Sequence, residues 1–160
     1  MSAGPPRTRR VESALALARD PHLLAALAAG PLCWAALIVV NLPLGSGVDG
    51  WALIHGVLLM PLLEEFVFRS GLQGWLLERR ALARRLPSAR LGISGANLIA
   101  SIVFAAAHLW TQPPLWAALI FLPSLVFGHL YERRQSIAGP VLVHAFYNAG
   151  FLMLFSGVPR

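Results

Sequence analysis

The sequence has no lysine, a single cysteine and few charged residues of any kind. Charged residues make up 12% of its 160 residues, while hydrophobic residues make up 57%. Soluble domains carry about 25% charged residues. This deficit excludes an ordinary soluble domain and indicates a chain surrounded by lipid. Because Cys33 has no second cysteine to pair with, a disulfide framework within the chain is also excluded.

Three long segments contain no Asp, Glu, Lys or Arg, and they run over residues 21–48, 91–131 and 135–159. Uncharged apolar segments of about 18 residues or more are typical of membrane spans. Turn and proline signals divide the chain into five expected spans: Leu23–Leu44, Trp51–Leu77, Ser94–Trp110, Leu115–Tyr131 and Ile137–Phe155. The sequence therefore predicts an all-α fold, a polytopic integral membrane helical bundle of about five transmembrane helices. Residues 1–160 form a single domain in this interpretation.

The net charge of +6 rests on arginines that are clustered between the apolar segments. The clusters lie within residues 7–19, 79–90 and 133–134, and the alternating loops contain no basic residue. Basic loops stay in the cytoplasm, so the N-terminal segment 1–20 is predicted to be cytoplasmic. This distribution favours membrane topology over a nucleic-acid partner. The composition, rich in Ala and Arg, indicates a bacterial protein, which we expect in the inner (cytoplasmic) membrane. The sequence does not predict the oligomeric state.

Two adjacent carboxylates, Glu64 and Glu65, interrupt the second expected span, and Arg69 follows. An ionisable group at membrane depth costs several kcal/mol, so it lines a cavity, pairs with a partner or takes part in chemistry. Glu65 and Arg69 are four residues apart and are predicted to pair on one helical face. Glu64 points about 100° away on a helix, which leaves one carboxylate for a cavity.

Two further spans carry a residue pair at the same spacing, Phe104 with His108 and His144 with Asn148. Counted at about 1.5 Å per residue, these groups and Glu64 converge in the inner half of the bilayer. A carboxylate in an apolar site suits a general base for water, an imidazole can share that water, and His and Asn groups can donate hydrogen bonds to an oxyanion. No serine is placed to act as a nucleophile, so hydrolysis by activated water is favoured over a covalent triad.

Two other readings use the same polar residues. Two His and one or two Glu match the ligand types of zinc, but the sequence has no His-Glu-x-x-His motif. We therefore predict no cofactor, with zinc as the competing chemistry. Buried Glu and His also form proton relays in transporters, although no inverted repeat is visible here.

Three motifs, in this order, resemble those of the CAAX protease and bacteriocin-processing (Abi) family of intramembrane endopeptidases. They occupy the region 61–148 and are Glu64-Glu65-x-x-x-Arg69, Phe104-x-x-x-His108 and His144-x-x-x-Asn148. One such motif alone is weakly specific, whereas three in order on apolar segments form a specific signal.

The resemblance implies a role for each motif residue. Glu64 and His108 would activate the attacking water, and His144 and Asn148 would form the oxyanion hole. The supporting residues would be Glu65, Arg69 and Phe104. The implied enzyme is a metal-free, glutamic-type intramembrane protease that cleaves a protein or peptide substrate in the membrane. The family's link to immunity leaves an alternative open, a bacteriocin self-immunity membrane protein without catalytic activity.

Overall fold

The computed structural model describes residues 15–40, 44, 48–85 and 92–155. Apart from one isolated bridge between Arg85 and Ser94, every regular element in these ranges is helical. Residues 1–14 of the predicted cytoplasmic segment lie outside the described part, as does 86–91 of the arginine-rich linker. The all-α prediction is confirmed over the part of the chain that the structure describes.

The first long helix, α2 (Pro21–Val39), begins where the sequence supplies a cap. The side chain of Asp20 accepts a hydrogen bond from the backbone N–H of His22 at 2.9 Å. Proline stands at the first helical position, where its missing N–H would have no partner in the helix anyway. The helix therefore starts two residues before the predicted Leu23.

Helix α2 packs along the last helix, α9 (Ala138–Phe155). Leu23 of α2 and Val143 of α9 belong to the same buried apolar cluster. Farther along the two helices, a Cβ atom at Gly150 would lie 2.1 Å from the ring of Trp34. The glycine therefore makes room for the indole where the two helices approach.

The second span is one continuous helix of 28 residues, Gly50–Leu77. Its successive parts are α3 (Gly50–Leu53), η1 (Ile54–Leu59), α4 (Met60–Glu65), η2 (Phe66–Gln73) and α5 (Gly74–Leu77), of which η1 and η2 are π-helical. Pro61 stands in the first turn of α4, directly after η1. Proline cannot donate a backbone hydrogen bond and its ring crowds the preceding turn, so the wider π-helical turn accommodates it. The second π-helical stretch follows the glutamate pair, in a position typical of functional sites.

Four helices in the described ranges are long and apolar enough to cross a membrane: Pro21–Val39, Gly50–Leu77, Pro114–Arg134 and Ala138–Phe155. The helix expected as the third of five spans is shorter. This helix, α7 (Gly95–His108), has 14 residues, or about 21 Å at 1.5 Å per residue, against a bilayer core of about 30 Å. Ser94 caps it as predicted, accepting from the N–H of Asn97 at 3.0 Å. The chain then turns back as α8 (Pro114–Arg134).

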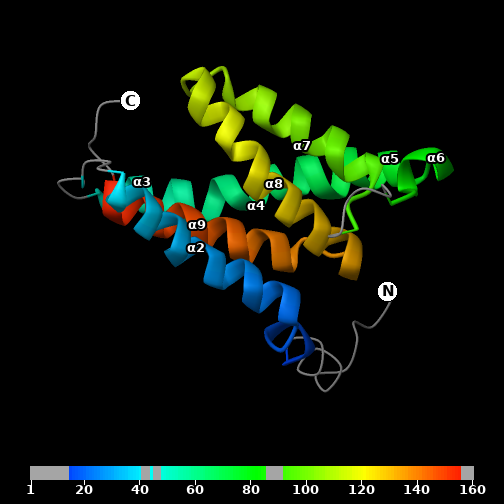
Figure 1. Cartoon of the computed structure of the whole chain (residues 1–160), viewed down its shortest axis with the longest axis horizontal. Helices are drawn as coiled ribbons and strands as arrows, with labels where there is room; N and C mark the ends of the chain where they lie inside the picture. Colours follow the sequence, from blue (N-terminus) through cyan, green and yellow to red (C-terminus); the bar gives the residue numbers. More distant parts are fainter. Residues whose placement is uncertain (1–14, 41–43, 45–47, 86–91, 156–160) are drawn as a thin grey trace, which may run out of the picture.

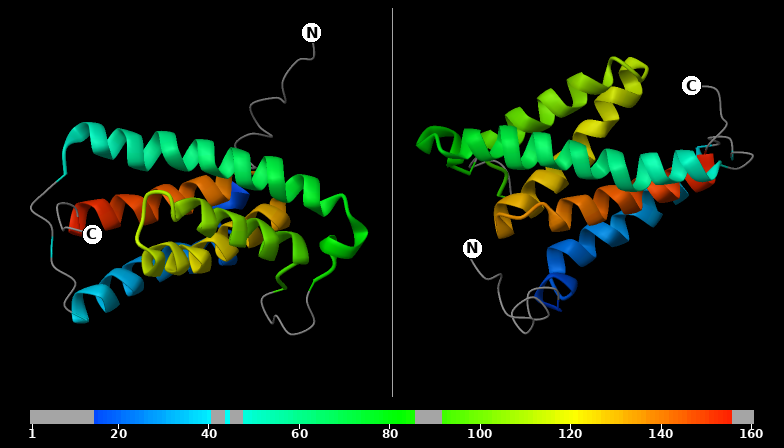
Figure 2. Two further views of the ribbon diagram at one scale, coloured as in Figure 1. Left: turned by 90° about the horizontal axis from the view of Figure 1, so that it is seen from above. Right: turned by 180° about the vertical axis from the view of Figure 1, so that it is seen from behind.

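Helix α9 lies in the middle of the bundle, between the long second span and α2 (Figure 2). Helices α7 and α8 form a hairpin whose tip diverges from the rest of the bundle (Figure 1). Many large apolar side chains point outward, among them Leu62, Phe66 and Val67 on the second span. Such a surface is suited to contact with acyl chains.

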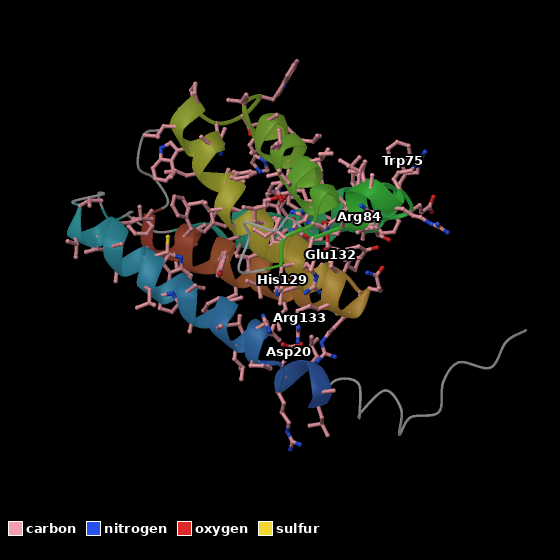
Figure 3. All side chains as sticks on the ribbon, turned by 45° about the vertical axis from the view of Figure 1, so that its right-hand side comes forward. Asp20, Trp75, Arg84, His129, Glu132 and Arg133 are labelled. Atoms are coloured by element: carbon pink, nitrogen blue, oxygen red, sulfur yellow. The ribbon has the colours of Figure 1, made fainter. Side chains whose placement is uncertain are left out.

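Polar and interfacial residues gather at one end of the bundle. Asp20, Trp75, Arg84, Glu132 and Arg133 all lie toward this end (Figure 3). It is the end that the arginine distribution assigns to the cytoplasm.

Candidate active site

The site is built around a buried ion pair on the second span. Arg69 Nε donates to Glu65 Oε2 at 3.0 Å, and neither side chain has any exposed surface. The predicted pairing of these residues is therefore confirmed. The guanidinium also donates from Nη1 to Gln73 Oε1 at 3.2 Å and from Nη2 to Ser124 Oγ at 2.7 Å. These contacts supply the additional hydrogen bonds that a buried charge requires.

The imidazole of His144 lies between the two carboxylates. Its Nδ1 is 2.8 Å from Glu65 Oε1, and its Nε2 is 3.5 Å from Glu64 Oε2. Because an ionised carboxylate only accepts hydrogen bonds, Nδ1 carries a proton and donates it to Glu65. One face of the His144 ring stacks on the ring of Phe127, with centroids 4.8 Å apart. His144 is thus fixed in both position and orientation.

The two carboxylates differ in their exposure, and the difference separates their roles. The Glu65 side chain is fully buried, whereas that of Glu64 is 19% exposed. Glu65 gives one oxygen to Arg69 and the other to His144. Glu64 is therefore the carboxylate that can reach a water molecule or substrate from outside the network.

The second imidazole, His108, lies at the end of α7 beside Phe104. Its Nδ1 is 2.8 Å from the carbonyl oxygen of Phe104. A carbonyl oxygen only accepts, so Nδ1–H donates and Nε2 is the acceptor of the neutral ring. The buried Phe104 ring lies 4.7 Å from the His108 ring and 5.9 Å from the His144 ring, between centroids. The Arg69 guanidinium of the second span lies over the same Phe104 ring, 5.3 Å from its centroid. Elements α4, α7 and α9 therefore converge as the spacing predicts.

Asn148 lies one turn beyond His144 on α9 and contacts a different part of the second span. Its Nδ2 donates to the carbonyl oxygen of Gly56, in η1, at 2.9 Å. This contact ties α9 to the first π-helical stretch. The structure therefore joins four of the predicted residues in one network, Glu64, Glu65, Arg69 and His144. His108 lies on the other side of the Phe104 ring from His144, and Asn148 contacts η1 instead.

Sequence reasoning missed three residues that complete the network: Gln73, Ser124 and Phe127. Gln73 continues the stripe of residues four apart begun by Glu65 and Arg69, and that spacing was a usable signal. Ser124 is a polar residue in an apolar span. Phe127 could not be predicted, because a phenylalanine that stacks on an imidazole cannot be told from any other apolar residue of a hydrophobic span.

A zinc site would need three or four converging donors. Over the described ranges, no group of three His, Cys, Asp or Glu side chains is arranged to hold a metal ion. Both oxygens of Glu65 are engaged by Arg69 and His144, and the guanidinium places a positive charge beside them. Glu65 is therefore not available as a zinc ligand.

The fold and the site together define a multi-pass membrane protein with a glutamate–histidine–arginine network inside an apolar helical bundle. The model of the family described as type II CAAX prenyl endopeptidase, Rce1-like, matches residues 46–150. The match covers more than half of the chain, and the chain belongs to this family. A comparison with curated proteins and one with solved structures each gave no match. Membership makes the chain a membrane-embedded protease of the CAAX endopeptidase class, whose substrate is a protein or peptide, and confirms the resemblance predicted from the three motifs.

Proposed function

We propose that the chain hydrolyses a peptide bond of a membrane-associated protein or peptide, using a water molecule activated by Glu64 and His108. The observation that carries this proposal is the position of His144 between a fully buried carboxylate, Glu65, and a partly exposed one, Glu64. The contacts of Glu65 fix the imidazole, and Glu64 faces outward beside it. A fixed imidazole next to an accessible base is the arrangement that acid–base hydrolysis needs.

In this mechanism Glu64 removes a proton from the water as the water oxygen bonds to the carbonyl carbon. The Nε2 lone pair of His108 accepts the other hydrogen of that water and orients it. When the carbon–nitrogen bond breaks, the proton held by Glu64 passes to the leaving nitrogen. The products are a new carboxyl terminus and a new amine.

The negative charge that develops on the carbonyl oxygen needs donors. We assign this role to Nε2 of His144, which donates when the ring carries both of its protons, and to the amide of Asn148. Glu65 supports the first donor because it accepts from Nδ1 at 2.8 Å and stabilises a positive ring. The Asn148 amide has a second N–H besides the one that it donates to Gly56.

The proposed setting is a bacterial cytoplasmic membrane, with cleavage in its inner half. The mechanism uses no metal, so EDTA is expected to leave the cleavage rate unchanged. A rate that EDTA abolishes and zinc restores would favour the zinc-dependent alternative.

The test compares membrane proteomes of cells that carry the wild-type chain, Glu64→Gln or Glu78→Gln. The first substitution keeps the shape of the side chain and removes the base. The second removes an exposed carboxylate at the C-cap, directly after the same span. We expect an uncleaved precursor to accumulate with Glu64→Gln and not with Glu78→Gln. Normal processing with Glu64→Gln would refute the proposed role of this residue.

A further inference from the structure

Beyond the site, hydrogen bonds continue from Arg69 toward the cytoplasmic end and stop at Glu132 on α8. Glu132 is half-buried at that end (Figure 3). Its Oε1 accepts from Gln73 Nε2 at 2.9 Å and from the hydroxyl of Ser94 at 2.5 Å. The contacts join η2, α8 and the cap of α7. The mechanism proposed above does not use Glu132.

The contacts of Gln73 require one orientation of its amide. An ionised carboxylate can only accept, so Gln73 turns its NH₂ group toward Glu132. The same nitrogen donates its other hydrogen to the carbonyl oxygen of Gly128 at 3.1 Å. The amide oxygen therefore points the opposite way, toward Arg69 Nη1 at 3.2 Å. Arginine has only donors. If the Gln73 amide were reversed, its NH₂ group would face the N–H of Arg69, and its oxygen would face the carboxylate of Glu132.

The same order of donors and acceptors continues to the imidazole. Arg69 Nε donates to one oxygen of Glu65, and the other oxygen accepts from His144 Nδ1. Glu132 and the Gly128 carbonyl together orient the Gln73 amide. The amide oxygen accepts from the Arg69 guanidinium, and the guanidinium holds the Glu65 carboxylate that accepts from the His144 ring.

We propose that Glu132 is a positioning residue, which keeps the Nδ1–H of His144 on Glu65 by acting through Gln73 and Arg69. The inference rests on the proposed function because it assumes that the orientation of His144 matters for catalysis. A glutamine at position 132 can present either a donor or an acceptor, so the Gln73 NH₂ group loses its charged acceptor and is held by the Gly128 carbonyl alone. The Gln73 oxygen is then held less firmly as an acceptor for Arg69, and the side chains of Glu65 and His144 can change their orientation.

A merely structural role of Glu132, as a tie between helices, predicts a different result. Ser94→Ala removes one hydrogen bond to Glu132 and the cap of α7, but it leaves the acceptor at Glu132 in place. It should therefore lower the unfolding temperature without changing the protonation of the His144 ring.

The experiment records ¹⁵N spectra of histidine-labelled protein in lipid nanodiscs near pH 8. The His144 signals are identified by their loss in His144→Gln. In the wild type and in Ser94→Ala we expect Nδ1 at the shift of a protonated nitrogen. In Glu132→Gln it should move toward the shift of an unprotonated nitrogen, and Glu132→Asp, which keeps an acceptor, should stay near the wild type.

With the precursor that accumulates in the Glu64→Gln cells as substrate, Glu132→Gln should lower kcat roughly ten-fold, with KM nearly unchanged. This is the lower end of the effect of groups that orient a ligand histidine in metal sites. Glu78→Gln serves as the control for loss of a carboxylate. Unchanged His144 signals in Glu132→Gln would overturn the inference, and so would equal shifts in Glu132→Gln and Ser94→Ala. The spectra need no cleavage assay, so they decide the placement of the ring even if Glu64→Gln shows that the proposed function is wrong.

Discussion

Arg69 carries its charge where no surface is exposed, and acceptors from two helices hold it there. Arg69→Met keeps much of the apolar volume but leaves Glu65 as a buried carboxylate without its cation. Breaking a buried pair in this way costs about 3–5 kcal/mol. We expect the free energy of unfolding to fall by about 3 kcal/mol, measured by thermal or denaturant unfolding in detergent micelles.

Arg80→Met is the matched control because this arginine is exposed on α6 (Arg80–Ala83). A substitution there should change the stability by less than about 0.5 kcal/mol. Equal stability of the two variants would show that the buried pair contributes nothing to the fold.

Asn148 is expected to act in catalysis as well as in packing. Asn148→Ala removes a proposed oxyanion donor, a loss worth about 10²–10³-fold in kcat. It also removes the hydrogen bond to Gly56 at 2.9 Å, worth about 1 kcal/mol. Steady-state kinetics should show the loss in kcat with KM nearly unchanged. If only stability falls, the amide serves to hold η1 and not to bind the oxyanion.

The sequence predicted the charged part of the site better than its surroundings. Glu65 and Arg69 were predicted to pair because a four-residue spacing fixes a common helical face. The contact of His144 with both carboxylates was not predicted, because spacing within one helix says nothing about the rotation of another. The bond from Asn148 to Gly56 was also missed, since a backbone acceptor leaves no signature in the side chains.

Gly128 marks the point where η2, α7 and α8 meet most closely. A Cβ atom there would lie 2.0 Å from Asn97 Oδ1 and 2.8 Å from Gln73 Oε1. Asn97 cannot easily give way, because it is fully buried and its amide donates to the carbonyl oxygen of Leu125. We expect Gly128→Ala to destabilise the protein by about 1–3 kcal/mol, measured by thermal unfolding.

Gly71→Ala provides the comparison, because its nearest contact would be a backbone oxygen at 3.7 Å. Alanine favours helices over glycine by about 1 kcal/mol, so this variant should be neutral or more stable. An equal gain from both substitutions would contradict the close approach at Gly128.

The helices themselves were predictable from apolar runs and caps, and the Ser94 cap of α7 was confirmed. Two features of the helices were not predicted. The π-helical stretches depend on how the second span fits its neighbours, and no local residue pattern encodes that fit. The expected third span proved too short to cross alone; its apolar sequence reflects contact with lipid and other helices, whereas its length is set by the turn that follows.

At the end of the bundle where Arg133 and Arg134 lie, Asp20 connects α2 to α8. It lies 3.0 Å from Arg134 Nε and 3.6 Å from Arg133 Nη2. Burial raises the pKa of Asp20, but the hydrogen bond from the His22 N–H and the two guanidinium groups outweigh burial and hold the pKa below its usual value. A lowered pKa in the folded state stabilises the protein above the unfolded pKa of about 3.9, and this contribution is lost as the pH falls through the folded value.

Asp20→Asn should therefore be less stable than the wild type at pH 6, and the difference should shrink as the pH falls below about 4. Unfolding temperatures of both proteins over this range measure the effect. A difference that persists unchanged at pH 3 would mean that the charge of Asp20 does not hold α2 in place.

The distribution of arginines predicted which ends of the spans lie together, and the structure places Asp20, Arg84 and Arg133 toward one end (Figure 3). The divergence of the α7–α8 hairpin (Figure 1) was beyond prediction, because apolar side chains specify lipid contact without fixing a crossing angle.

The central claim is that Glu64 drives hydrolysis inside the bundle. Its most direct test is the cleavage rate of the accumulated precursor by purified protein in liposomes, for the wild type, Glu64→Gln and Glu78→Gln. We predict that wild type and Glu78→Gln cleave at similar rates, and that Glu64→Gln is slower by about 10³-fold, within the range attributed to general base catalysis. Equal rates for the wild type and Glu64→Gln would contradict the claim.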